Sequence, residues 1–97
     1  MKQILLNEII EYGLHDSCIV KFTIDFKYSM IRLYIRTSCR SFRIDCMYIE
    51  YFSGIGFDEK NMPVILDYSL TDKRIKIFTT LSEWIDIFAK KILIYEL

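Results

Sequence analysis

The chain contains few residues that interrupt regular structure: three glycines and one proline among 97 residues. Because 53% of the residues are hydrophobic, the composition also excludes a disordered chain. A chain of this length has enough residues for one hydrophobic core but not for two. Residues 1–97 are therefore predicted to form a single domain.

Long apolar runs are missing as well. The longest, such as residues 4–6 and 92–95, are far too short to span a bilayer. Glu8 and Glu11 interrupt the first apolar segment, which makes it a poor secretory signal peptide. We therefore expect no membrane partner and a cytoplasmic location.

Residues that carry chemistry are scarce. The three cysteines are an odd number without Cys-x-x-Cys spacing, which favours reduced thiols over disulfides. With one histidine, they also lack the spacing of a zinc site. No cofactor and no metal are predicted. The cysteines are Cys18, Cys39 and Cys46.

The single histidine, His15, is followed by Asp16, Ser17 and Cys18, a combination that invites a catalytic interpretation. A nucleophile needs a base within hydrogen-bond reach and a third group that orients the base. Neighbouring residues on an extended strand point to opposite faces, so these side chains are poorly placed for such a site. We interpret the stretch as a turn that leads into a strand, and we expect no enzyme activity.

Hydrophobic spacing predicts a helix over residues 2–12, with Gly13 ending it, and a second helix over residues 81–92. Between them, apolar and polar residues alternate as in half-buried strands. The order predicts an α+β fold: an antiparallel β-sheet of about five to seven strands, half-barrel or sandwich-like, with an N-terminal and a C-terminal helix packed against it. A mostly β half-barrel or sandwich with one helix is the alternative. The predicted strands are residues 17–26, 30–36, 41–52, 64–70 and 74–80. Short turns at residues 27–29 and 71–73 predict that the first two and the last two form hairpins, and the alternation places Phe26 on the inward face of the first strand.

The formal net charge is zero, but the charges are segregated along the chain. Residues 19–43 hold six basic residues against Asp25 alone, and residues 44–72 hold six acidic residues against Lys60 alone. Such segregation either steers a charged partner or pairs charges across neighbouring strands. Both interpretations stay open.

The outward-facing basic residues suggest one function. A sheet face that mixes cations and rings is typical of single-stranded RNA readers, so a small RNA-binding module is the alternative hypothesis. The neutral total charge and the acidic segment count against it, and nucleic acid is an unlikely partner. The face would hold Lys21, Arg32, Arg36, Arg43, Arg74 and Lys76, with Tyr34 and Phe78.

The acidic segment suggests the opposite partner. Aromatic rings mixed with carboxylates suit the capture of a basic protein surface, because rings anchor an interface and charges orient the encounter. The candidate partner-binding residues are Glu50, Tyr51, Phe57, Asp58, Glu59 and Asp67.

The stretch "GLHDSCIVKFTIDF" followed by "MIRLYIR", within residues 13–37, resembles small β-rich bacterial immunity proteins. These are the cognate antitoxins of polymorphic toxin and contact-dependent growth inhibition systems. The resemblance implies a cytoplasmic inhibitor that binds the C-terminal toxin domain of its partner and covers the active site. Such toxins are often nucleases with basic clefts, which an acidic surface would fit.

Overall fold

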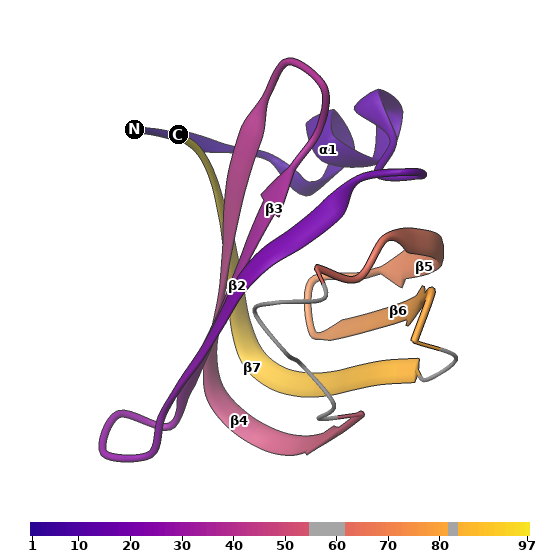
Figure 1. Ribbon diagram of the computed structural model, residues 1–97. Coiled ribbons are helices and arrows are strands. Elements are labelled where there is room, and N and C mark those ends of the chain that lie inside the picture. Colours follow the sequence, from indigo (N-terminus) through magenta and orange to yellow (C-terminus); the bar gives the residue numbers. More distant parts are fainter. Residues whose placement is uncertain (55–61, 82–83) are drawn as a thin grey trace.

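The computed structural model describes residues 1–54, 62–81 and 84–97. Over these residues the chain has seven strands and one short helix (Figure 1). In chain order the elements are β1 (Lys2–Ile4), α1 (Leu6–Tyr12), β2 (Cys18–Asp25), β3 (Met30–Arg36), β4 (Ser41–Ser53), β5 (Ile65–Leu70), β6 (Arg74–Thr79) and β7 (Trp84–Glu96).

The strands form one antiparallel sheet in the order β2-β3-β4-β7-β6-β5, and β1 pairs with the end of β7. The central strands, β4 and β7, are long and bend strongly, so the sheet curls (Figure 1). Cys18 and Val64 form an antiparallel bridge, and the Ile19 N–H donates to the carbonyl of Pro63 at 2.9 Å. The two outer strands of the curled sheet therefore meet at one end.

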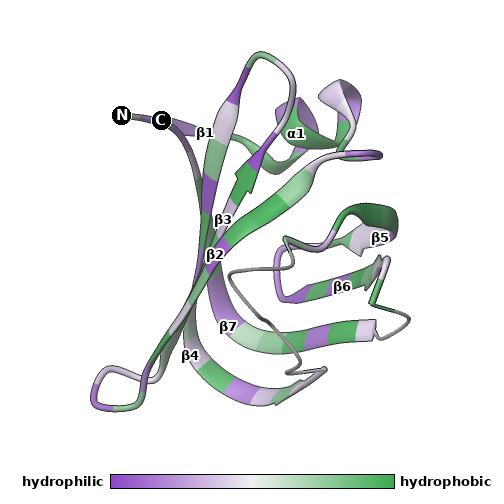
Figure 2. Ribbon diagram, in the orientation of Figure 1, coloured by the Kyte–Doolittle hydropathy of each residue, from purple (hydrophilic) through white to green (hydrophobic). Residues whose placement is uncertain are grey.

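The hydrophobic core lies inside the curl. Alternation along each strand places isoleucine after isoleucine on the concave face, and Figure 2 shows the alternating bands on β6 and β7. Phe42 on β4 is fully buried at the end of the core near α1, where its ring meets the edge of Tyr12 at 5.6 Å.

Helix α1 ends where the sequence predicted. Gly13 has φ of +86°, a backbone conformation that favours glycine, and its N–H donates to the carbonyl of Ile9 at 3.0 Å. Ile9 is the buried residue of the helix. No helix within the described residues is long and apolar enough to cross a membrane.

The prediction of an N-terminal and a C-terminal helix packed against the sheet is wrong. Only Leu6–Tyr12 is helical, residues 2–4 are strand β1, and the segment from Trp84 onward is strand β7. In β7 the inward residues alternate with the outward ones, and this period of two prevails over the helical spacing. The long strand is favoured because β4 pairs with it on one side and β6 and β1 on the other.

The predicted strand pairs are confirmed. β2 and β3 form a hairpin, as do β5 and β6, and the long third strand is β4. The register of β2 shifts between Ile19 and Lys21, so Ile19 is buried while Val20 is only half-buried. Phe26, which the alternation predicted to face inward, lies beyond the end of β2 and is exposed.

Candidate functional site

The tip of the β2–β3 hairpin is held against β4. Asp25 Oδ1 accepts hydrogen bonds from the N–H groups of Lys27 at 3.0 Å and Tyr28 at 3.2 Å, which closes the turn. The Ile49 N–H then donates to the backbone carbonyl of Ser29 at 3.2 Å and to its Oγ at 3.0 Å. These bonds hold the turn against the second half of β4.

Strand β4 is irregular beside this turn. Tyr48 has φ of +58°, a conformation that bulky side chains rarely adopt. The register between β4 and β7 also shifts between Ile49 and Tyr51, so Glu50 is the extra residue of a bulge. Bulges redirect side chains, and here Tyr48, Glu50 and Tyr51 all end up exposed.

A groove of about 370 Å³ lies between the hairpin and β4. Most of its described lining residues are apolar, and the charged ones among them are both carboxylates, Asp25 and Glu50. The lining residues are Ile24, Asp25, Phe26, Ser29, Met30, Ile31, Ile49, Glu50, Tyr51 and Phe52.

Exposed rings gather around this groove. Phe26 is 82% exposed and Tyr51 is 53% exposed, and both line it. Tyr28 and Tyr48 are 62% and 60% exposed and adjoin lining residues in the chain. We call these four rings, together with Asp25 and Glu50, the tip surface. Clustered exposed rings on a small protein mark a site of interaction.

The tip surface contains two of the residues predicted to bind a partner, Glu50 and Tyr51. Asp67 is not with them, because it lies on β5 and strands β7 and β6 separate β5 from β4. Its Oδ1 accepts the N–H of Tyr68 at 2.9 Å. The other three candidates, Phe57, Asp58 and Glu59, lie outside the described residues.

Sequence reasoning missed the remaining members of the tip surface. Tyr28 stands in a predicted turn, where side chains are usually exposed, so the sequence held a signal for it. Phe26 was assigned to the inward face, and the exposed Tyr48, whose φ of +58° departs from strand geometry, lies beside the bulge in β4. No local pattern indicates that bulge.

The stretch around His15 is a turn that leads into β2, as predicted. His15 Nδ1 lies 3.0 Å from the carbonyl oxygen of Leu66, and its ring packs against that of Tyr68 at 5.1 Å. The hydroxyl of Tyr68 accepts the N–H of Leu14 at 3.0 Å. These contacts join the start of β2 to β5. Among the described residues, no group of three or more His, Cys, Asp or Glu side chains is placed to hold a metal ion.

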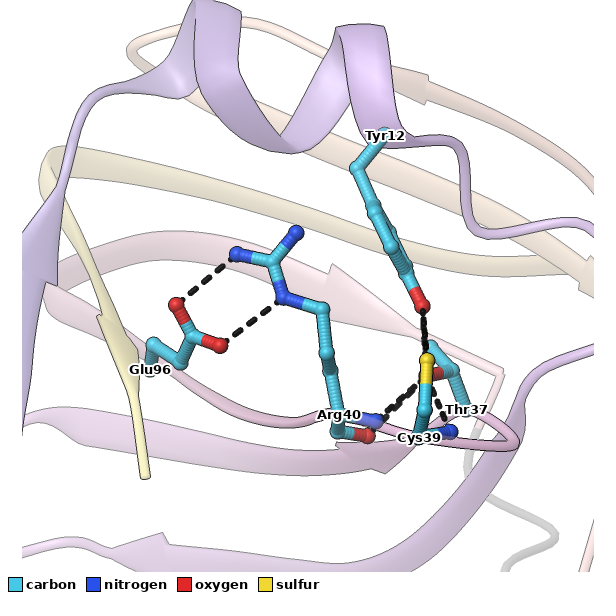
Figure 3. Close-up of polar contacts among 5 residues, drawn as sticks. All are labelled: Tyr12, Thr37, Cys39, Arg40 and Glu96. Atoms are coloured by element: carbon cyan, nitrogen blue, oxygen red, sulfur yellow. Dashed lines mark hydrogen bonds and ion pairs between the residues drawn. The ribbon is translucent and has the colours of Figure 1, made fainter.

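A second polar cluster lies at the other end of the sheet, beneath α1 (Figure 3). Arg40 and Glu96 form a bidentate pair with two bonds of 2.8 Å. The guanidinium of Arg40 also lies 4.4 Å from the centroid of the Tyr12 ring. The Tyr12 hydroxyl in turn lies 2.8 Å from Thr37 Oγ1 and 3.4 Å from Cys39 Sγ. We call these five residues the α1 clamp.

The cysteines differ in their environment. The hydrogen bond from Tyr12, with smaller effects of Ser38 and of the charge on Arg40, lowers the pKa of the exposed Cys39 thiol. Burial raises the pKa of Cys46 to about 12. Cys39 is thus the more nucleophilic of the two at neutral pH, because the thiolate is the reactive form.

Comparison with protein-family models, curated proteins and solved structures finds no match to this chain. The function therefore has to be inferred from the surfaces of this chain. Among the described residues, the tip surface gathers most of the exposed aromatic side chains.

Proposed function

We propose that the protein is an immunity protein that binds the toxin domain of a cognate contact-dependent or polymorphic toxin and neutralises it. The tip surface is the docking site. The observation that supports this proposal most directly is the set of exposed rings around an apolar groove whose charged lining residues, among those described, are carboxylates. The resemblance of residues 13–37 to immunity proteins supplies the biological setting.

The rings are suited to anchor a protein partner. Tyrosine and phenylalanine bury a large area with few rotatable bonds, so they contribute strongly when a partner excludes water from them. The tip surface places them on two different elements, the hairpin turn and the β4 bulge, with a groove between. A protruding side chain of the toxin can enter that groove while the rings pack around it.

The carboxylates favour a basic partner. Glu50 makes no hydrogen bond and no ion pair within the described part of the chain, so it is free to meet a lysine or arginine. Asp25 uses Oδ1 for the turn. A nuclease toxin binds phosphates through basic side chains, and carboxylates presented beside rings would occupy those side chains.

The groove is suited to binding rather than to reaction. Its described lining holds neither histidine nor cysteine, and most of its walls are aliphatic or aromatic. Within the described residues, the Ser29 hydroxyl accepts the N–H of Ile49 and has no hydrogen bond to Asp25 or Glu50, as a nucleophile paired with its base would have. This agrees with an inhibitor that acts by covering its target.

Co-expression tests the proposal. The C-terminal domain encoded by the gene immediately upstream is expressed alone and together with this protein. We expect the domain to kill cells alone, and we expect this protein to rescue them and to co-purify with the domain. Absence of both rescue and complex would overturn the immunity function.

Matched variants then test the docking site. Glu50→Lys and Tyr48→Ala are each expected to raise the Kd for the toxin domain by about tenfold or more, as for central interface residues. The controls are Asp72→Lys and Trp84→Ala, because both side chains are exposed away from the groove. If rescue persists and both tip variants bind as tightly as the controls, the immunity function stands and the tip surface is wrong.

A further inference from the structure

The convex face of the sheet carries a row of alternating cations and rings. The strand register places Lys21 of β2 opposite Tyr34 of β3, Tyr34 opposite Arg43 of β4, and Arg43 opposite Tyr95 of β7. Lys21 Nζ lies 5.4 Å from the centroid of Tyr34, and the Arg43 guanidinium lies 4.7 Å from that of Tyr95. Four neighbouring strands therefore present one continuous line of positive and aromatic groups, which we call the convex row.

Arg43 of the convex row and Arg32 of the next line share a single carboxylate, that of Asp45. Arg43 binds the carboxylate of Asp45 with bonds of 3.0 and 3.1 Å, and Arg32 Nε lies 3.3 Å from Asp45 Oδ1. Asp45 is 4% exposed, so these two guanidiniums share one nearly buried carboxylate. The Nε of Arg32 is itself buried and has no hydrogen bond to any described residue. An additional anion would satisfy the excess charge.

The part of the convex face formed by β2, β3, β4 and the C-terminal half of β7 is basic although the chain is neutral. Because partners in an antiparallel pair share a face, the register assigns five cations and two carboxylates to it. Arg36 is exposed and forms no ion pair within the described residues. The cations are Lys21, Arg32, Arg36, Arg43 and Lys91, and the carboxylates are Asp25 and Asp45.

We propose that the convex face binds single-stranded nucleic acid, with phosphates on Lys21, Arg36 and Arg32 and a base stacked on Tyr34. Phosphate groups would neutralise the positive charge of this face. They can approach an exposed lysine or arginine without breaking the ion pairs that Asp45 makes. The rings between the cations favour nucleic acid over an acidic protein, because every base has a face that stacks on an aromatic ring. This activity goes beyond the proposed immunity function, since it uses another face of the molecule.

The residues predicted to form one basic sheet face are divided between two places in the structure. Arg74 and Lys76 lie on β6, away from the convex row, and Arg74 is held by Asp86 with bonds of 3.0 and 2.9 Å. Lys76 Nζ lies 4.8 Å from the ring of Trp84. Asp86 holds the Arg74 guanidinium, and the Lys76 ammonium lies against the ring of Trp84, so we assign the nucleic-acid face to β2, β3 and β4.

Fluorescence anisotropy with a labelled oligo(U) RNA at low salt tests the proposal. The Lys21→Glu/Arg36→Glu variant is expected to lower the affinity by about tenfold or more and to reduce the slope of log K against log salt by about one for each phosphate that it no longer binds. The Lys27→Glu/Lys73→Glu variant makes the same change of charge on exposed residues outside the convex row, and it should bind much better. Circular dichroism confirms that each variant is folded.

Tyr34→Leu separates stacking from charge. It is expected to weaken RNA binding several-fold and to leave heparin binding unchanged, because heparin has no bases to stack. Three results would each overturn the proposal: no RNA binding by the unmodified protein at low salt, equal losses in the two double variants, or equal affinity for polyglutamate and RNA. Equal effects of Tyr34→Leu on RNA and heparin would also overturn it.

Discussion

Aromatic rings are covered by a cation at one end of the curled sheet and exposed at the other. At the α1 end, the guanidinium of Arg40 lies 4.4 Å from the ring of Tyr12 and 4.9 Å from that of Phe42, and Glu96 holds the guanidinium in place. At the hairpin end, the rings of the tip surface are mostly exposed. One sheet therefore carries rings that stabilise the fold at one end and rings that are available to a partner at the other.

The difference shows what decides the role of a ring in this protein. A cation fixed by a carboxylate covers a ring and excludes a partner from it, while the same packing stabilises the fold. Within the described residues, Tyr28 is the one ring of the tip surface with such a neighbour, the Nζ of Lys27 at 5.4 Å, and no described carboxylate binds that lysine as Glu96 binds Arg40. Four predictions test this contrast, from the largest expected effect to the smallest.

Removing a ring should be costly at the α1 end and nearly neutral at the tip. Phe42→Ala is expected to lower the free energy of unfolding by about 3–5 kcal/mol, because the ring is fully buried and a cavity remains. Phe26→Ala should lower it by less than about 1 kcal/mol. Urea unfolding followed by circular dichroism measures both. Similar losses in the two variants would contradict the contrast.

Replacing Tyr48, whose backbone is strained, should stabilise the fold rather than destabilise it. Tyr48→Gly is expected to raise the free energy of unfolding by about 1 kcal/mol, because glycine adopts a φ of +58° without steric cost. Tyr51→Gly is the control and should be destabilising, since Tyr51 pairs with Phe88 across the strand ladder. Thermal unfolding of both proteins compares them. A lower melting temperature for Tyr48→Gly would show that the ring stabilises the fold.

The α1 clamp should make the free energy of unfolding depend on pH. Arg40 holds the pKa of Glu96 below its ordinary value of 4.5, so the carboxyl is more acidic in the folded than in the unfolded protein. The stabilisation that Glu96 provides is therefore fully present above about pH 4.5. It is lost as the pH falls through the lower pKa that Glu96 has in the folded protein. Unfolding measured from about pH 6 to about pH 3 should lose less stability in Glu96→Gln and in Arg40→Gln than in the unmodified protein. Unchanged profiles in both variants would exclude a role for the pair.

The smallest effect concerns the thiol of the clamp. Cys39 should react with iodoacetamide well before Cys46 at neutral pH, because it is exposed and its pKa is lowered, whereas that of Cys46 is raised to about 12. Tyr12→Phe removes the hydrogen bond that lowers the pKa most and should slow the reaction a few-fold. Mass spectrometry of the labelled peptides follows both sites. An equal rate in Tyr12→Phe would show that the hydroxyl does not act on the thiol.

The sequence by itself determined five of the seven described strands and two of the six strand pairs. Alternation within residues 30–36 correctly predicted the buried face of β3, and short turns predicted two hairpins, because these patterns involve residues close in the chain. Gly13 likewise marked the end of α1, since only the local backbone conformation matters there. Of the tip surface, Glu50 and Tyr51 could be selected from composition, although composition could not show that Asp67 lies apart from them.

The tertiary structure decided the rest. Residues 84–96 have both helical and strand spacing, and they form β7 because β4, β6 and β1, all distant in sequence, supply its backbone partners. The bulge next to Tyr48 lies in the half of β4 that bends beside β7 (Figure 1). The sharing of Asp45 by two guanidiniums requires β3 and β4 to be in register. In each case the deciding interaction joins residues far apart in the chain, so no local pattern contains it.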